Sequence, residues 1–161
     1  DERRRFAQVS HEYLIEQLQF TGDESLKIGT EKVRMNFNHP VKELVWCMHS
    51  SDAKPGVFDK FTESARILLN GHDRMAERDG SYFNLVQPYQ HHTRMPEKNV
   101  YCYSFALKPE DHQPSGTCNF SRIDNATLSL QVDNDCTAKV FAVNYNVLRI
   151  MSGMGGLAYS N

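Results

Sequence analysis

Long hydrophobic runs and a strong excess of one charge are both missing from this sequence. No stretch approaches the roughly 18 apolar residues that a membrane-spanning helix needs, and no signal-peptide pattern is present. The 18 basic and 20 acidic side chains give a formal net charge of −2, so no broad positive field can attract a polyanion. Arg3, Arg4 and Arg5 are expected to be solvated at a frayed terminus. We therefore expect neither a membrane span nor direct nucleic-acid contact.

Cysteines are few, and the common catalytic motifs are missing. Cys47, Cys102, Cys118 and Cys136 form no C-x-x-C pair and have no metal-finger spacing. Each lies in or beside an apolar segment, which favours reduced, buried thiols over nucleophiles. The sequence also has no G-x-S-x-G elbow and no Walker-type loop. We predict no catalytic residues and no enzymatic activity.

Seven histidines are present, but their spacing does not predict a metal site. A metal-binding β-barrel typically presents two histidines at i and i+2 on one strand face, together with a carboxylate. His91 and His92 are adjacent and would point to opposite faces of a strand. The prediction is therefore no metal and no cofactor, with a cupin-like metalloenzyme left as an alternative that metal analysis would decide.

The C-terminal glycines match the spelling of a dinucleotide-binding turn. Gly153 to Ala158 fits G-x-G-x-x-A, but that motif requires a following helix and an acidic residue about 20 positions further on. Within this sequence only three residues follow Ala158. The glycines are therefore expected to form a flexible tail.

The strongest pattern that is present has period two, which is typical of half-buried strands. The alternating apolar residues are Val33, Met35, Phe37, Ala126, Leu128, Leu130 and Val132. In 101–107, large Tyr101, Tyr103, Phe105 and Leu107 alternate with small residues, which suits packing between two sheets.

Two segments, 44–48 and 140–151, are apolar on both faces and predict central strands that are covered on each side. Segment 10–20 is expected to be a strand, and 81–92 is expected to hold a short helical turn before Pro88. Turn signals separate the strands at short intervals. The sequence thus predicts an all-β sandwich, with one domain covering residues 1–161.

Aromatic residues in the irregular segment between Gly80 and Pro96 have two possible uses. Tyr82, Phe83 and Tyr89 could contact a partner subunit, which we favour, or form a sugar-binding platform. A carbohydrate-binding module is therefore the alternative function.

Asn119 and Asn125 begin sequences that match the glycosylation acceptor pattern. The pattern is common by chance, so both are expected to be unmodified.

Four long stretches closely resemble the C-terminal part of the major capsid proteins of large icosahedral double-stranded DNA viruses, of the iridovirus and phycodnavirus type. They are NFNHPVKELVW (36–46), LLNGHDRMAERDGSYFNLVQPYQHHTR (68–94), YCYSFALKPEDHQPSGTCNFSRIDNATLSL (101–130) and AVNYNVLRIMSGMGGLAYSN (142–161).

This resemblance implies a jelly-roll β-sandwich, the second of two jelly rolls in a longer chain, of which 1–161 would be a fragment. Family members form homotrimers, and the trimers form pseudo-hexagonal capsomers that tile an icosahedral shell around an internal membrane. The implied partners are copies of the same protein and other capsid proteins. The implied location is the virion capsid, which is assembled in the cytoplasm of the infected cell.

Overall fold

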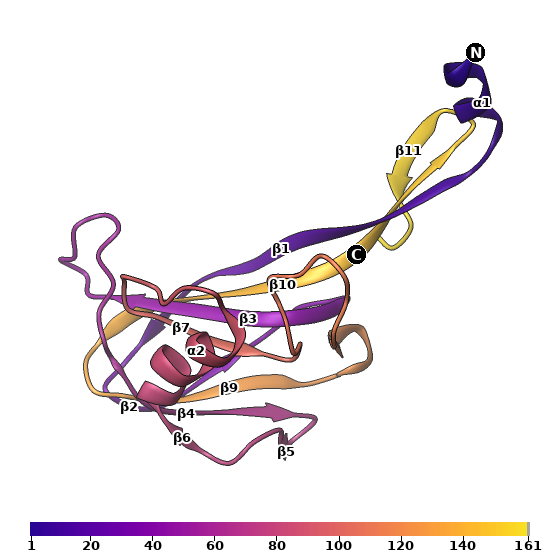
Figure 1. The fold of residues 1–161 in the computed structure, drawn as a ribbon. Coiled ribbons are helices and arrows are strands. Elements are labelled where there is room, and N and C mark those ends of the chain that lie inside the picture. Colours follow the sequence, from indigo (N-terminus) through magenta and orange to yellow (C-terminus); the bar gives the residue numbers. More distant parts are fainter. Residues whose placement is uncertain (161) are drawn as a thin grey trace.

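The computed structural model describes residues 1–160, and about half of them lie in strands (Figure 1). In chain order the elements are α1 (Glu2–Gln8), β1 (His11–Leu26), β2 (Gly29–Arg34), β3 (Pro40–His49), β4 (Thr62–Leu69), β5 (His72–Asp73), β6 (Arg78–Asp79), the π-helix η1 (Tyr82–Val86), α2 (Gln87–His91), β7 (Val100–Ser104), β8 (Cys118–Asn119), the 3-10 helix η2 (Phe120–Arg122), β9 (Ala126–Val132), β10 (Cys136–Met151) and β11 (Met154–Leu157).

Two antiparallel sheets form the layers of a β-sandwich (Figure 1). Sheet A has the strand order β1-β10-β3-β7, with β11 paired to β10 and β8 paired to β3. Sheet B has the order β2-β9-β4-β5, with β6 paired to β4. The predicted all-β sandwich is confirmed, and the segments predicted to be central contribute β3 and β10, which both lie inside sheet A.

The residues with period-two spacing form the core, as predicted. All seven alternating side chains are buried: Val33, Met35, Phe37, Ala126, Leu128, Leu130 and Val132. Sheet A contributes Leu44, Trp46 and Met48 from β3, and each of these is fully buried. The Trp46 ring lies 5.2 Å from Phe83 and 5.8 Å from Tyr101, measured between centroids. One continuous core therefore joins both sheets.

The prediction for 101–107 holds only in part. Tyr101 and Tyr103 lie in the core, but the side chain of Leu107 is 76% exposed. The alternation fails because β7 ends at Ser104, and the next two backbone amides both donate to the carbonyl oxygen of Lys42. This bend takes the chain out of the sheet before it reaches Leu107.

β1 and β10 are each 16 residues long and continue beyond the sandwich as an arm (Figure 1). His11 pairs with Ile150 and Phe20 pairs with Phe141, which confirms the strand predicted for 10–20. Residues 140–146 of β10 are largely covered, but from Val147 onward the strand is half-buried or exposed. The prediction of burial on both faces was therefore wrong for 147–151, because this part of β10 runs in the arm.

The glycine-rich C-terminus is a β-hairpin, which corrects the expectation of a flexible tail. β11 pairs with the end of β10, and Met151 lies opposite Met154. The two loop residues, Ser152 and Gly153, have φ angles of 53° and 76°. Positive φ at both loop positions is the geometry of a type I′ turn, whose twist matches that of the flanking strands. Gly153 is therefore explained by turn geometry instead of flexibility.

This turn predicts a local effect of substitution at Gly153. Gly153→Val should destabilise the β10–β11 hairpin by about 1–2 kcal/mol, because a β-branched residue is strained at positive φ. Hydrogen exchange should show faster exchange of the β11 amides with little change in the sandwich. Gly155→Ala is the matched control, since an added Cβ would make only an ordinary contact with Ile150. Equal exchange in wild type and Gly153→Val would contradict the prediction.

The helical turn predicted within 81–92 is confirmed as η1 followed by α2. The helix continues through Pro88 because that residue lies in the first turn of α2, where a missing N–H is tolerated.

At the N-terminus, Arg3, Arg4 and Arg5 lie in α1 at the tip of the arm (Figure 1), and all three are exposed as expected.

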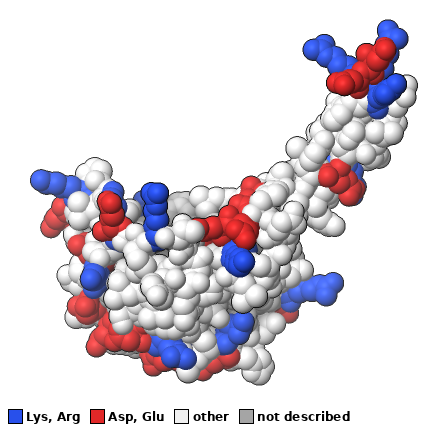
Figure 2. Space-filling view, viewed as in Figure 1, with Lys and Arg blue, Asp and Glu red and all other residues white. Residues whose placement is uncertain are grey.

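Basic and acidic side chains are interspersed over the face drawn in Figure 2, in agreement with the small net charge. Among residues 1–160, no helix has the length and apolar character required to cross a membrane.

Candidate functional site

The three aromatic residues predicted at a subunit interface do not share one surface. Phe83 is 0% exposed and its ring packs against Trp46 in the core. Its side chain is therefore unavailable to a neighbouring subunit, and this part of the prediction needs correction. Tyr82 is half-buried, with its hydroxyl accepting from Gln87 Nε2 at 2.9 Å. Only Tyr89, which is 80% exposed, presents most of its ring to a potential partner.

Tyr89 belongs to a small apolar patch that the sequence analysis missed in part. Leu85 and Val86 at the end of η1 are also exposed. Leu85 and Tyr89 are four residues apart in one helical segment, so they lie toward the same side. We call Leu85, Val86 and Tyr89 the helical patch. Large apolar side chains that are exposed on one helical segment suit a contact surface.

A second apolar surface lies on the side of sheet A that faces away from sheet B. Strand pairing places five residues together there: Leu18, Phe20, Val45, Phe141 and Val143. We call this set the outer apolar face. Leu18 is 64% exposed, and Phe20 stacks on Phe141 with 4.7 Å between ring centroids. β1 is therefore an edge strand that presents large apolar side chains on this side.

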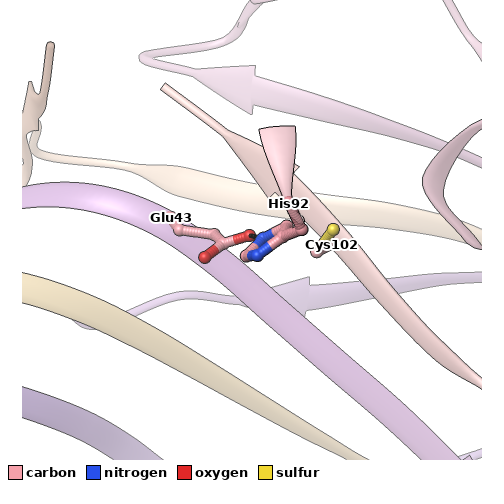
Figure 3. A group of neighbouring side chains, drawn as sticks. All are labelled: Glu43, His92 and Cys102. Carbon is pink, nitrogen blue, oxygen red and sulfur yellow. Dashed lines mark hydrogen bonds and ion pairs between the residues drawn. The ribbon is translucent and has the colours of Figure 1, made fainter. Parts of the chain in front are cut away.

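The same side of sheet A carries a partly buried ionic cluster (Figure 3). Glu43 lies on β3, and His92 follows directly after α2. Nε2 of His92 bonds to the Glu43 carboxylate, and its Nδ1 lies 3.0 Å from Oε1 of Glu110. Cys102 of β7 lies beside this pair. A single imidazole thus joins two carboxylates, one buried and one near the surface.

Hydrogen bonding to Glu43 raises the pKa of His92, against the opposing effect of burial. The backbone N–H of Thr93 lowers the pKa of Glu110, and His92 adds to that effect. The positive charge of an imidazolium that lies between two carboxylates stabilises the negative charge of both. The cluster in this form neutralises a carboxylate on a strand that is otherwise mostly apolar.

The four thiols are free and none is activated for nucleophilic chemistry within residues 1–160. Burial raises the pKa of Cys47, Cys102 and Cys118, and raises that of Cys136 to about 11. Thiols of this kind remain protonated at neutral pH, and a thiol is a weak nucleophile compared with a thiolate.

The pair His91 and His92 was predicted to lie in a strand, but the structure places it at the end of a helix. His91 is the last residue of α2, and its Nδ1 lies 3.1 Å from the carbonyl oxygen of Gln87. His92 is not in a strand, so the strand spacing rule did not apply to it. Its partners are far away in the sequence. The only local signal was Glu43, a charged residue within an apolar run.

Asn119 and Asn125 are both exposed. Oδ1 of Asn119 accepts from the Ser121 amide at 3.1 Å, which caps η2. The expectation that neither carries sugar stays a prediction.

The whole chain is similar to one family of viral proteins. Residues 2–156 match the family described as large eukaryotic DNA virus major capsid protein. The chain is 60% identical to the major capsid protein of Pyramimonas orientalis virus, over 100% of this chain and 46% of that protein. It is 44% identical to the major capsid protein of Paramecium bursaria Chlorella virus 1, over 99% of this chain and 51% of that protein. The chain spans about half the length of these relatives.

Solved structures agree with this result. The chain matches the quasi-atomic model of the PBCV-1 virus capsid with a TM-score of 0.86 and 42% identity, over 99% of this chain and 54% of that chain. The Faustovirus major capsid protein shares the fold, with a TM-score of 0.70 at 15% identity, over 84% of this chain and 33% of that chain. The expected jelly-roll β-sandwich is thereby confirmed. The chain belongs to the family of large eukaryotic DNA virus major capsid proteins.

Proposed function

We propose that this chain is a structural part of a viral capsid and acts by assembly, without catalysis. The observation that carries the proposal is the outer apolar face, where large side chains such as Leu18 and Phe20 stay exposed on an ordered sheet. Such a surface gains free energy when another layer covers it, at about 25 cal/mol per Å² of apolar area. The names of its relatives support a location in the virion capsid. Assembly in the host cytoplasm is a further part of the proposal.

In this proposal, another part of a longer chain packs on the outer apolar face and buries it. Residues 1–161 align with only 46% and 51% of the length of two relatives, which supports a further domain in the unmatched part. In this proposal 1–161 is the C-terminal jelly roll, and the first jelly roll packs beside it. The arm, with apolar Met154 and Leu157 exposed, is a further surface for such a contact.

Contacts between subunits would complete the shell. We assign the helical patch to a contact between copies of this protein, within a homotrimer or between neighbouring capsomers. Repetition by symmetry lets each contact stay modest while the shell as a whole is stable. Other capsid proteins would also bind through apolar contacts of this kind. The proposal involves neither direct binding of DNA nor a membrane-spanning segment.

Oligomerisation of the intact protein tests the proposal directly. Native mass spectrometry should show trimers, and a monomer that persists at high concentration would count against assembly. Tyr89→Ala should weaken association by about 1–2 kcal/mol, or roughly 5- to 30-fold, because it removes the most exposed ring of the helical patch.

Ile28→Ala is the matched control for Tyr89→Ala, since Ile28 is an exposed apolar residue outside both surfaces. Unchanged assembly in Tyr89→Ala would remove the helical patch from the interface. If glycan binding were instead found and lost in this variant, the carbohydrate-binding alternative would gain.

A further inference from the structure

We propose that Glu43, His92 and Cys102 form a binding site for a transition-metal cation, and that the cation it suits best is Zn²⁺. Each residue offers one ligand atom, and these atoms all lie within 4.8 Å of one another. Ligand atoms around a tetrahedral zinc ion are between 3 and 4 Å apart, at bond lengths of roughly 2.0–2.3 Å. Small side-chain movements are therefore enough to close the site around an ion.

The fold fixes two of the three ligands on adjacent strands. Val45 of β3 pairs with Cys102 of β7, and Glu43 pairs with Ser104. Glu43 and Cys102 are therefore diagonal neighbours on the same face of sheet A. His92 reaches them from the segment that follows α2 (Figure 3). A bound ion would join β3, β7 and this connecting segment.

The ligand types favour zinc over the hard cations. Imidazole nitrogen, thiolate sulfur and carboxylate oxygen are the donors found at zinc sites, whereas Mg²⁺ and Ca²⁺ require mainly oxygen ligands. One thiolate and one carboxylate would also balance the two positive charges of the ion. Binding would displace the protons carried by Sγ and Nε2, because a coordinating thiol is deprotonated outright.

Glu110 occupies the position of an outer-shell partner. Its Oε1 lies 3.0 Å from Nδ1 of His92 and also accepts from the Thr93 amide at 3.0 Å. A histidine that ligates through one nitrogen commonly donates its other N–H to a carboxylate, which fixes the ring orientation. This contact directs Nε2 toward Glu43. The cluster also borders a cavity of about 260 Å³ lined by Arg94 and Met95, with room for a water molecule as fourth ligand.

Metal binding by the intact, metal-free protein tests this site. Zn²⁺ should bind with one ion per chain and raise Tm by roughly 5–10 °C at a 100-fold excess over Kd. Co²⁺ should give a thiolate-to-metal absorption band in the near ultraviolet. Cys102→Ser should abolish that band, while Cys118→Ser, which alters a thiol outside the cluster, should retain it.

Glu110→Gln provides a second test and should leave the fold intact, because Glu110 lies near the surface. This variant should weaken Zn²⁺ binding about 10- to 100-fold, as expected for an outer-shell residue. Two results would overturn the proposal. One is the absence of stoichiometric Zn²⁺ binding at micromolar concentrations, and the other is a cobalt band that survives in Cys102→Ser.

Discussion

Replacing Trp46 by Ala is expected to lower the free energy of unfolding by about 3–5 kcal/mol. Trp46 is fully buried and its ring contacts Phe83 and Tyr101, which belong to η1 and β7. Its removal leaves a cavity between β3, η1 and β7. The surrounding side chains can move into such a cavity only in part. The free energy of unfolding therefore falls both because apolar burial is lost and because packing contacts are lost.

Urea unfolding of the intact protein measures this change. Trp46 is the only tryptophan in the sequence, so far-ultraviolet circular dichroism should be used in place of its fluorescence. Trp46→Phe should cost less, because a ring remains to contact Phe83. Ile28→Ala, at an exposed position, should change stability by no more than about 0.5 kcal/mol. A loss below 1 kcal/mol for Trp46→Ala would contradict the central role of this side chain.

Alternation along the chain was enough to predict the sandwich and most of its core. Residues such as Val33 and Leu128 are buried because each strand has one face toward the opposite sheet, and that constraint is local. At Leu107 the alternating pattern no longer predicts burial. Its spacing continued the pattern, but the chain left the sheet after Ser104 because of hydrogen bonds to Lys42, a residue far away in the sequence.

The functional surfaces were harder to predict than the core. Phe83 and Tyr89 lie in the same helical segment, yet one is buried and the other is exposed. Whether each side chain is buried depends on how η1 packs against Trp46, and no local sequence pattern predicts that packing. The ionic cluster was missed for the same reason, since Glu43 and His92 meet only through the fold. The C-terminal hairpin was different: the Ser-Gly turn was visible locally but was interpreted as flexibility.

Three separate apolar surfaces are consistent with a protein that is covered on several sides in its working state. The outer apolar face belongs to the sheet, the helical patch to η1 and α2, and the hairpin to the arm. Charges of both signs are interspersed over the face drawn in Figure 2. Apolar areas would supply most of the association energy, while the surrounding charges would select orientation.

The second large effect is expected at the ionic cluster. His92→Ala should lower the free energy of unfolding by about 3 kcal/mol, because it leaves the Glu43 carboxylate buried without its partner. The side chains of Glu43 and His92 are only 7% and 24% exposed, so water can replace the lost bond only in part. The measurement should be made with a chelator present, so that no divalent cation contributes.

A double-mutant cycle separates this electrostatic cost from simple loss of packing. Glu43→Gln in the His92→Ala background should recover part of the stability, since a neutral amide of similar shape is easier to bury than an unpaired carboxylate. Lys27→Ala, which breaks an exposed ion pair with Asp135, is the control and should cost no more than about 1 kcal/mol. Strict additivity of His92→Ala and Glu43→Gln would show that the two side chains contribute independently. In that case the cost of losing His92 would come from packing, because an electrostatic cost requires Glu43 to respond to the loss of its partner.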